Sequence, residues 1–371
     1  MEVAVLTDER LLVVNAGSSS LKLRLLGPED EVLRTLDLAA THGRFSRDEV
    51  EAALSDVGRV DVVGHRVVHG GTFFTEAVVI HAEVRTKLES LVSVAPLHQP
   101  PALGALDLVT ELLPAAPQVA CFDTAFHASI PPAAATYAIP DEWRREYSIR
   151  RYGFHGLSHA YASRRAAELL DRPITELRTV TCHLGAGASL AAVRSGVSID
   201  TTMGFTPLEG LVMATRSGTI DPGIVPWLQQ QAGLEVGEIA DALERRSGVA
   251  GLAGTPDMKE VLERAAAGDP DAGLAVDVYV HRLSGSIAAM AASLGGLDAI
   301  VFTGRIGERA AVIRERTAEA LAWLGVEFDA DRNATVDTDA EIGAPHSKVR
   351  MLVVESREDL EIARQVRTIL A

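Results

Sequence analysis

The sequence is poor in cysteine, carries no excess of basic residues and lacks long apolar runs. Its two cysteines, Cys121 and Cys182, lie in short apolar runs and form no CxxC pair. This pattern is typical of buried thiols in a reducing compartment and gives no disulfide framework. The formal net charge is −16, so a nucleic-acid partner, which needs a broad basic face, is not expected.

Membrane and secretion signals are also missing from the sequence. No run approaches the ~18 apolar residues of a membrane helix. The N-terminal stretch has no positive region, and Asp8, Glu9 and Arg10 interrupt its apolar residues early, unlike a signal peptide. We therefore expect a cytoplasmic protein with no membrane partner. Its 371 residues are enough for two domains, each with a core of its own.

Short runs rich in β-branched residues alternate with longer helical patterns, which predicts an α/β fold. Strands are expected at 11–17, 21–27, 60–68, 118–123, 179–185, 188–196, 299–304 and 349–356. Helices are expected at 157–170, 224–232, 258–267 and 274–295.

Two stretches share one pattern, in which an apolar strand, a glycine and small residues lead into a second strand. They are "VVNAGSSSLKLRLL" and "TCHLGAGASLAAVR". Gly17 aligns with Gly185, about 168 positions later, and a shift by one aligns the serines that follow instead. This spacing indicates two domains that each open with a Gly/Ser-rich β-hairpin, and two unrelated hairpins are the alternative. Backbone N–H groups and serine hydroxyls in such a turn could bind phosphate.

Three charged residues lie in settings that are typical of ligand-binding sites. Arg66 and Arg216 occur in glycine-rich turns, where a guanidinium could hold carboxylate or phosphate with two parallel donors. Asp123 follows the apolar run "QVACF", at the strand end where α/β folds bind ligands, and could hold Mg²⁺. The alternatives are surface or ion-paired arginines and a helix N-cap at Asp123.

Together these stretches resemble the acetate kinase (acetate/propionate kinase) family. The motifs "VVNAGSSSLK", "GHRVVHGG", "APLHQPP", "FDTAFH", "YGFHGLSH", "CHLGAGAS", "TTMGFTPLEGLVMATRSG", "SGVAGLAGTPDMK" and "FTGRIGE" follow one another in the family's order. The resemblance implies the duplicated α/β fold of actin-like ATPases and sugar kinases, with two domains and a central cleft. It places an acyl/phosphate domain at 1–126 plus 359–371 and a nucleotide domain at 127–358, which also forms a homodimer.

The resemblance further implies reversible, in-line phosphoryl transfer from ATP to acetate or propionate, giving an acyl phosphate and ADP. A carboxylate is already ionised at neutral pH, so the reaction needs positioning and charge neutralisation more than a strong base. The implied catalytic residues are Arg66, His98, Asp123, His155 and Arg216, and Asn15, Asp123 and Glu358 would position Mg²⁺ or Mn²⁺.

The implied substrate pockets involve further residues of the same motifs. An apolar acyl pocket would be formed by Val68, Leu97, Phe154 and Pro207, next to Arg66. The nucleotide and its phosphates would contact Asn15, Ser18, Ser20, Lys22, His183, Gly185, Ala186, Gly187, Asp257, Met258, Lys259, Gly304, Arg305, Ile306 and Gly307.

Departures from the family pattern cluster on the nucleotide side. Ala186 stands where the family has asparagine, and Arg305 and Arg309 replace a glycine and an asparagine. An arginine at 305 would either fill the adenosine pocket or stack on the base. Two alternatives therefore stay open: the same acyl chemistry with pyrophosphate or another inorganic donor, and a non-catalytic sensor of acyl phosphate or nucleotide.

Overall fold

In the computed structural model, which describes residues 9–17, 20–40, 45–92 and 99–371, the chain forms two compact units. Unit 1 comprises Met1–Ala128, Phe154–Leu157 and Arg357–Ala371. Unit 2 comprises Ser129–Gly153 and Ser158–Ser356. The chain therefore passes between the units more than once, and the C-terminal segment returns to unit 1.

Unit 1 is built on a six-stranded sheet in the order β3-β2-β1-β4-β6-β5. Strands β1, β2 and β3 are antiparallel, β1, β4 and β6 are parallel, and the short edge strand β5 runs antiparallel to β6. Their bounds are Leu11–Ala16 (β1), Ser20–Leu26 (β2), Val32–Ala39 (β3), Val62–Val67 (β4), Val78–Val79 (β5) and Gln118–Phe122 (β6).

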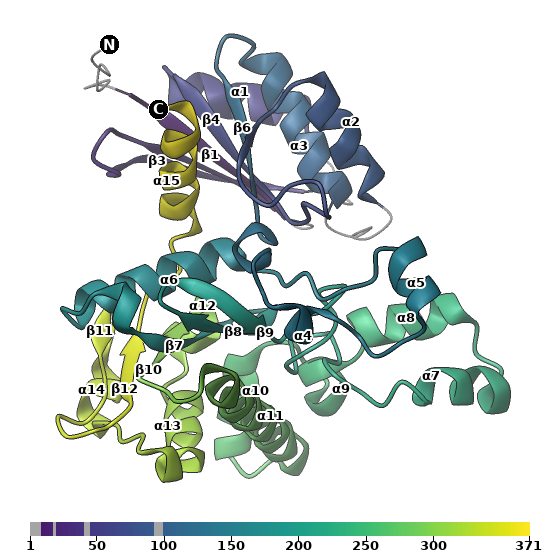
Figure 1. Ribbon diagram of the computed structural model, residues 1–371, viewed down its shortest axis with the longest axis vertical. Coiled ribbons are helices and arrows are strands. Elements are labelled where there is room, and N and C mark those ends of the chain that lie inside the picture. Colours follow the sequence, from purple (N-terminus) through teal and green to yellow (C-terminus); the bar gives the residue numbers. More distant parts are fainter. Residues whose placement is uncertain (1–8, 18–19, 41–44, 93–98) are drawn as a thin grey trace. The chain divides into compact units, whose positions relative to one another are not determined.

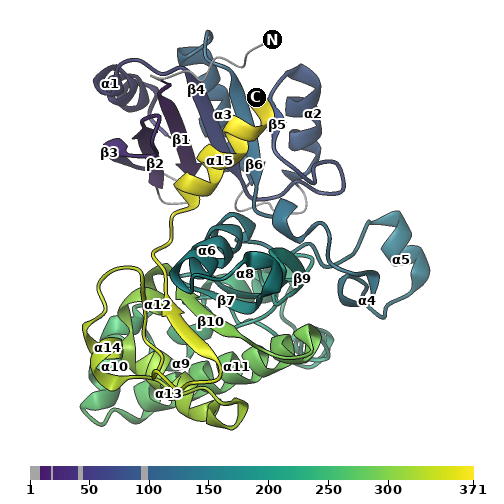
Figure 2. The same ribbon diagram turned by 60° about the vertical axis from the view of Figure 1, so that its left-hand side comes forward.

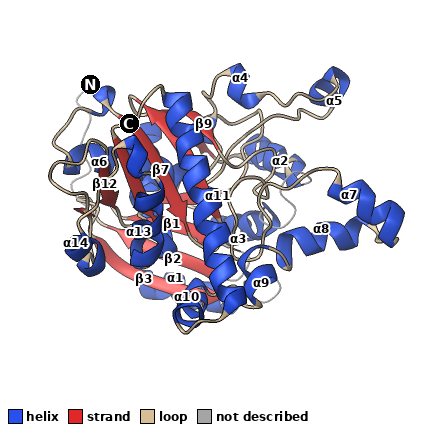
Figure 3. Ribbon diagram, turned by 90° about the horizontal axis from the view of Figure 1, so that it is seen from below, coloured by secondary structure: helices blue, strands red, loops and turns tan. Residues whose placement is uncertain are grey.

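Unit 2 repeats this topology with its own six strands, in the order β11-β12-β10-β7-β8-β9. Figure 3 labels β7, β9 and β12 of this sheet. Strands β7, β8 and β9 are antiparallel, β7, β10 and β12 are parallel, and β11 is antiparallel to β12. Read from the other edge, each strand matches its counterpart in unit 1, which confirms the duplicated α/β fold. The bounds are Arg178–Leu184 (β7), Ala188–Arg194 (β8), Val197–Thr201 (β9), Ala299–Thr303 (β10), Ala340–Glu341 (β11) and Arg350–Val353 (β12).

The two opening hairpins differ by one residue in the turn. In unit 1, Ala16 pairs with Leu21, whereas in unit 2, Leu184 pairs with Ala188. The first strands of the hairpins therefore align with one sequence spacing and the second strands with a spacing one residue shorter. The alignment of Gly17 with Gly185 is therefore correct for the first strands, whereas the alternative alignment of Ser20 with Ser189 is wrong, because the turn of the second hairpin is shorter and not longer.

Helices cover both faces of the sheet in unit 1. Ile362, Ala363 and Val366 of α15 pack on Leu11 and Val13 of β1 (Figure 2). Helix α1 and helix α3 cover the alternate residues of β1 and β2 in a second apolar cluster. Because helices cover both faces of the sheet, side chains on either face of a strand are buried, and the strands are therefore apolar at nearly every position. The helices are Arg47–Val57 (α1), Ala82–Ser90 (α2), Gln99–Leu112 (α3) and Glu358–Leu370 (α15).

In unit 2, helix α6 packs Ala162 and Ala166 against β10 and β12, and the long helix α11 lies along β8 and β9 (Figure 1). Asp269 caps the first turn of α11, and Gly295 (φ +68°) ends it. The helices are Pro132–Ala135 (α4), Asp141–Glu146 (α5), Gly156–Leu169 (α6), Ile224–Trp227 (α7, continued by a π-helical turn Leu228–Ala232), Val236–Arg245 (α8), Gly248–Ala253 (α9), Met258–Ala266 (α10), Pro270–Leu294 (α11), Gly304–Arg309 (α12), Ala311–Ala320 (α13) and Ala330–Thr335 (α14).

Both cysteines are buried in the described part of the chain, in β6 and β7, as the sequence predicts. Burial raises the pKa of both the Cys121 and the Cys182 thiol, so neither is poised as a nucleophile. Within the described residues, every helix is too short or too polar to cross a lipid bilayer.

Buried histidines in unit 1 make its stability depend on pH. His65 Nε2 lies 2.7 Å from Gln118 Oε1, and His127 Nε2 lies 3.0 Å from the Phe154 carbonyl oxygen. Burial lowers the pKa of each imidazole from 6.5 to about 4. Below pH 6.5 the unfolded chain therefore binds more protons than the folded chain, and stability falls as the pH falls towards 4.

We expect each of these histidines to remove about 1.5 kcal/mol of stability between pH 6.5 and pH 5. Urea unfolding of the wild type and of His127→Gln at both pH values measures this loss, which should be smaller in the variant. His346, which is 75% exposed, provides the matched control His346→Gln. An equal pH dependence in wild type and His127→Gln would contradict the assignment of His127 as a buried neutral group.

Candidate active site

Four predicted site residues of unit 1 form one hydrogen-bonded network around Arg66. Arg66 Nε donates to both carboxylate oxygens of Asp123, at 3.1 and 3.2 Å, and Nη2 donates to Oδ2 at 2.7 Å. Arg66 Nη1 lies 3.3 Å from Asn15 Oδ1 and 3.2 Å from Glu358 Oε2. Asn15 Nδ2 donates to the same Glu358 oxygen at 3.1 Å. The network therefore joins all four side chains.

The fold explains why these residues meet. Asn15 lies near the end of β1, Arg66 near the end of β4, Asp123 directly after β6, and Glu358 begins α15. These are the carboxyl ends of neighbouring parallel strands, where α/β folds place their ligand sites. Residues that are far apart in the sequence thus converge on one edge of the sheet.

The charges in this network are held in a largely dry environment. The Asp123 side chain is 1% exposed, Glu358 13% and Arg66 19%. Burial acts to lower the pKa of Arg66, but the charges of Asp123 and Glu358 outweigh it and raise the pKa above its ordinary value. Arg66 is therefore a permanent cation that two carboxylates hold in place.

The residues predicted to position a divalent cation offer two carboxylates and one amide oxygen. These are the hard oxygen ligands that Mg²⁺ prefers, and Mg²⁺ commonly binds through one or two carboxylates plus water and phosphate. Among the described residues, no group of three or more His, Cys, Asp or Glu side chains forms a complete metal site. The chemistry of Asn15, Asp123 and Glu358 therefore fits a divalent cation such as Mg²⁺.

His155 is fixed beside Asp123 by its backbone. Its φ of +56° is unusual for a residue other than glycine. The next residue, Gly156, donates its N–H to the Asp123 carbonyl oxygen at 2.9 Å, and a Cβ there would collide with that oxygen. Strained backbone of this kind persists where the surroundings impose it, often at functional sites.

The remaining predicted residues of unit 1 that the structure describes lie on β2, directly after β4 and shortly before α6. Phe154 is buried and packs edge-to-face on His69, whereas Val68 is half-buried. Lys22 is exposed and pairs across the hairpin with Asn15, and Ser20 is half-buried at the start of β2. Three predicted residues, Ser18, Leu97 and His98, lie outside the residues that the structure describes.

In unit 2, three predicted motifs assemble around the turn of the second hairpin, residues 185–187. The turn is closed by a hydrogen bond from Gly185 N to Gly187 O at 3.0 Å. Ala214 N donates to Ala186 O at 3.0 Å, and Ala250 N donates to Ala214 O at 2.9 Å. The segments around Arg216 and at the start of α9 are thereby attached to the turn. His183, just before the turn, lies 2.8 Å from Ser158 Oγ through Nδ1.

Arg216 is half-buried and uses little of its hydrogen-bonding capacity within the described part of the chain. Its Nη1 donates to the Pro207 carbonyl oxygen at 2.6 Å, which uses one of five donors. Among the described residues, no carboxylate forms an ion pair with it, and burial lowers its pKa, with Glu244 acting weakly in the opposite direction. A half-buried cation with free donors is suited to bind an anionic group.

The predicted residues of α10 and α12 have different environments. Asp257 caps α10 by accepting from Lys259 N at 3.0 Å, and Lys259 is exposed, 3.9 Å from Glu263. These contacts of Asp257 and Lys259 are local to α10, where Met258 is buried. In α12, Gly304 and Gly307 are buried, Ile306 is half-buried, and Arg305 and Arg309 are exposed.

Gly304 joins α12 to the second hairpin at a position that excludes any side chain. Its φ is +75°, and a Cβ would lie 2.8 Å from the Leu184 carbonyl oxygen and about 3 Å from two further backbone atoms. Gly304→Ala is therefore expected to destabilise the chain by about 2 kcal/mol, measured by urea unfolding.

The matched control is Gly285→Ala in α11, where a Cβ would meet nothing within 4 Å. This change should leave stability unchanged or raise it by up to about 1 kcal/mol, because alanine favours helix. Equal free energies of unfolding for the two variants would contradict the close approach of Gly304 to Leu184.

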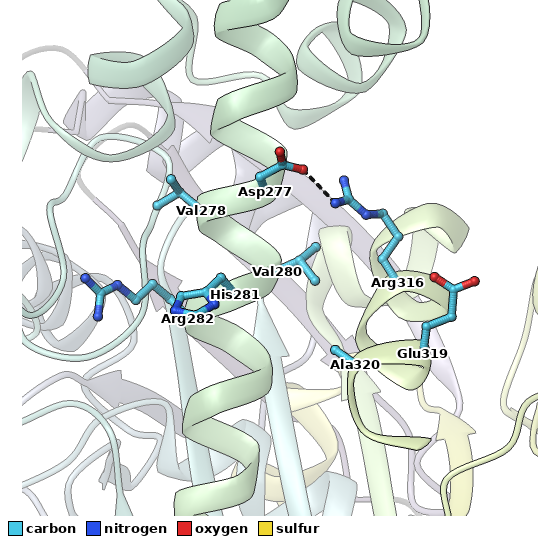
Figure 4. Close-up of a pocket in the computed structure, with 8 residues that line it drawn as sticks. All are labelled: Asp277, Val278, Val280, His281, Arg282, Arg316, Glu319 and Ala320. Atoms are coloured by element: carbon cyan, nitrogen blue, oxygen red, sulfur yellow. Dashed lines mark hydrogen bonds and ion pairs between the residues drawn. The ribbon is translucent and has the colours of Figure 1, made fainter. Parts of the chain in front are cut away.

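A groove elsewhere in unit 2 contains none of the predicted residues. It has a volume of about 700 Å³ and lies between α11 and α13 (Figure 4). Asp277 and Arg316 form an ion pair at 2.6 Å at its edge, and His281, Arg282 and Glu319 also line it. Its mixed charges do not indicate a particular ligand.

Tyr137, Arg151 and Glu209 were not predicted, yet they interact directly with the segment that carries Pro207 and leads to Arg216. Glu209 lies within the family motif "TTMGFTPLEGLVMATRSG", and Arg151 directly precedes the motif "YGFHGLSH". Tyr137 lies in none of the family motifs. Nothing in the sequence shows that the three side chains meet, because their partners lie far along the chain.

Comparisons with known proteins agree with this arrangement. Residues 44–364 match the sequence profile of the acetokinase family. The chain is 40% identical to an acetate kinase of Carboxydothermus hydrogenoformans, with 96% of this chain and 98% of that protein aligned. It is 41% identical to an acetate kinase of Bacillus cytotoxicus over the same shares.

The chain is also similar to solved structures of acetate and propionate kinases. An acetate kinase of Porphyromonas gingivalis superposes with a TM-score of 0.90 at 36% identity, covering 98% of this chain and 100% of that one. A propionate kinase of Francisella tularensis superposes with a TM-score of 0.89 at 37% identity, covering 96% and 98%. The chain therefore belongs to the acetokinase family.

Proposed function

We propose that the protein reversibly transfers the γ-phosphoryl group of ATP to acetate or propionate, giving an acyl phosphate and ADP. The named relatives are acetate kinases and a propionate kinase. The observation in this chain that carries the proposal is Arg216, a half-buried cation that uses one of its five donors among the described residues. Such a group suits a reaction whose substrates are both anions.

The proposed step is one direct in-line displacement. A carboxylate oxygen of the acid attacks the γ-phosphorus, the bond from phosphorus to the bridging oxygen breaks, and ADP leaves with the electron pair. The acid is already ionised, so no general base has to remove a proton. The chain's contribution is positioning and neutralising charge on the transferred group.

Each charged residue has a proposed role in that step. Arg66 and Arg216 bind the acid's carboxylate and the phosphoryl oxygens, and His155 donates to those oxygens, with His98 in support. Asp123 and Glu358 keep Arg66 oriented through the bonds described above. Together with Asn15 they would hold Mg²⁺ or Mn²⁺, which supplies positive charge to the phosphates when bound.

The acid's alkyl group would lie against Val68, Phe154 and Pro207, together with Leu97. An apolar pocket discriminates weakly, by about 1–3 kcal/mol per methylene group. We therefore propose a short-chain acid as acceptor, with acetate and propionate both used. The homodimer and the cytoplasmic location predicted from the sequence are carried forward as part of this proposal.

Trapping the acyl phosphate as a hydroxamate tests the proposal. Acetate, propionate and butyrate are each incubated with Mg²⁺ and ATP, and the reverse reaction is followed from acetyl phosphate and ADP. Hydroxamate from acetate or propionate, and ATP in the reverse direction, are expected. A lack of both products, with pyrophosphate and phosphate as well as with ATP and ADP, would overturn the kinase proposal and favour the sensor, which would still bind acetyl phosphate or ATP in calorimetry.

An inorganic donor is the second candidate, because Arg305 is exposed at the start of α12 where the family has glycine. Parallel reactions with pyrophosphate in place of ATP, and with phosphate in place of ADP, distinguish the two donors. Activity with pyrophosphate alone would favour this candidate. Arg305→Gly should then restore use of ATP if the arginine fills the adenosine pocket.

A further inference from the structure

The segment from Thr202 to Glu209, between β9 and Arg216, is held by side chains of the preceding segment 129–153. Arg151 Nη1 donates to the carbonyl oxygens of Thr202 and Met203, at 3.0 and 3.1 Å. The backbone N–H of Phe205 donates to the Tyr137 hydroxyl at 3.0 Å. Tyr137 follows α4, which lies beside β9 (Figure 1).

Glu209 joins these two side chains at the far end of the same segment. Its Oε1 accepts from Arg151 Nη2 at 2.7 Å, and its Oε2 accepts from the Tyr137 hydroxyl. The Arg151 guanidinium also lies over the Tyr137 ring, 5.4 Å from its centre. The Arg151 side chain is 16% exposed and that of Glu209 32%. Charge-assisted bonds in partly buried positions are stronger than those between exposed ion pairs.

The backbone of the segment is fitted closely to this network. The Gly204 carbonyl oxygen accepts from Tyr152 N at 3.0 Å and from Gly153 N at 3.4 Å. A Cβ at Gly204 would collide with the Glu209 carboxylate and the Tyr137 hydroxyl. The path of residues 202–209 is thus fixed at both ends and in the middle.

This path sets the position of the atom that orients the Arg216 side chain. The Pro207 carbonyl oxygen, inside the segment, accepts from Arg216 Nη1 at 2.6 Å. Pro207 also belongs to the predicted acyl pocket. A shift of the segment would therefore move the Pro207 carbonyl oxygen that orients the Arg216 guanidinium. It would also move one wall of the predicted acyl pocket.

We propose that Tyr137, Arg151 and Glu209 are positioning residues for phosphoryl transfer to the acid, acting through Pro207 and Arg216. The inference rests on the proposed function and adds three residues that do not themselves touch a substrate. We expect these residues to affect binding of the acid and the rate of phosphoryl transfer. Binding of the phosphoryl donor should depend on them much less.

Tyr137→Phe tests the proposal, since it removes one hydroxyl and keeps the ring. We expect kcat/KM for the acid to fall about tenfold, with the donor KM within twofold of wild type. Amide hydrogen exchange within 202–209 should become faster. Tyr147→Phe is the matched control, because Tyr147 is 57% exposed, and it should behave as wild type.

A double-variant cycle shows whether the effect passes through Arg216. In an Arg216→Lys background, adding Tyr137→Phe should change kcat/KM for the acid less than twofold, because the contact that it disturbs is already lost. A tenfold change there as well, equal changes in both KM values, or behaviour identical to Tyr147→Phe would overturn the proposal.

The exchange measurement needs no enzymatic activity. An inactive wild type would therefore refute the proposed function, while the exchange of residues 202–209 would still decide whether the network holds the segment. Unchanged exchange in Tyr137→Phe would overturn the inference even if the kinase activity is found.

Discussion

Replacing Arg216 with glutamine is expected to lower kcat for acyl phosphate formation about 1,000-fold, because a cation that stabilises a transferring phosphoryl group contributes on this scale. The fold should survive the change, since within the described residues the side chain makes one hydrogen bond, to the Pro207 carbonyl oxygen, and that bond is not part of a carboxylate pair. Initial rates measured with saturating acid and donor test the expectation.

The matched control is Arg245→Gln, at the C-terminal end of α8. Arg245 is 61% exposed and lies 3.4 Å from Asp241, so its loss should leave kcat within twofold of wild type. A tenfold effect or less in Arg216→Gln would contradict the role assigned to Arg216, provided that the control behaves as expected.

Replacing Arg66 should impair both activity and stability. Arg66→Gln removes the guanidinium that neutralises Asp123, whose side chain is 1% exposed, and the loss of one partner from a buried pair is expected to lower stability by about 3 kcal/mol or more. We expect kcat to fall about 1,000-fold in parallel. Thermal unfolding and initial rates measure the two effects.

Arg66→Lys separates the charge from the geometry. Lysine keeps the positive charge but cannot form the two parallel bonds to Asp123, so stability should largely return while kcat stays about 100-fold low. Arg85 makes a similar paired contact with Asp107, at 2.6 and 2.7 Å, and Arg85→Lys is the control that should leave kcat unchanged. Full activity in Arg66→Lys would show that charge alone suffices.

The sequence predicts the central elements of the fold well and its edges poorly. Short apolar runs rich in β-branched residues correctly indicated β1, β2, β4 and β6 with their counterparts in unit 2, and α6, α10 and α11 were expected within a few residues of their bounds. The edge strands Val78–Val79 and Ala340–Glu341 have two residues each, which is too short for any periodicity. Such strands are specified by the neighbouring strand with which they pair.

In the candidate site, the sequence predicts which residues take part but not which of them contact one another. Motifs singled out Asn15, Arg66, Asp123 and Glu358, and the structure brings these four together in one network. Their pairing could not be predicted, because it depends on strands β1, β4 and β6 ending at the same edge. The contact of Arg216 with a backbone carbonyl was equally hidden, since every residue type supplies a carbonyl oxygen.

The stereochemistry at phosphorus tests the central claim most directly. ATP made chiral at the γ-phosphorus with oxygen isotopes is reacted with acetate, and the configuration of the acetyl phosphate is determined. A single in-line displacement by the carboxylate predicts inversion of configuration. Retention would require two displacements through a phosphorylated enzyme residue, and it would contradict direct transfer between ATP and the acid.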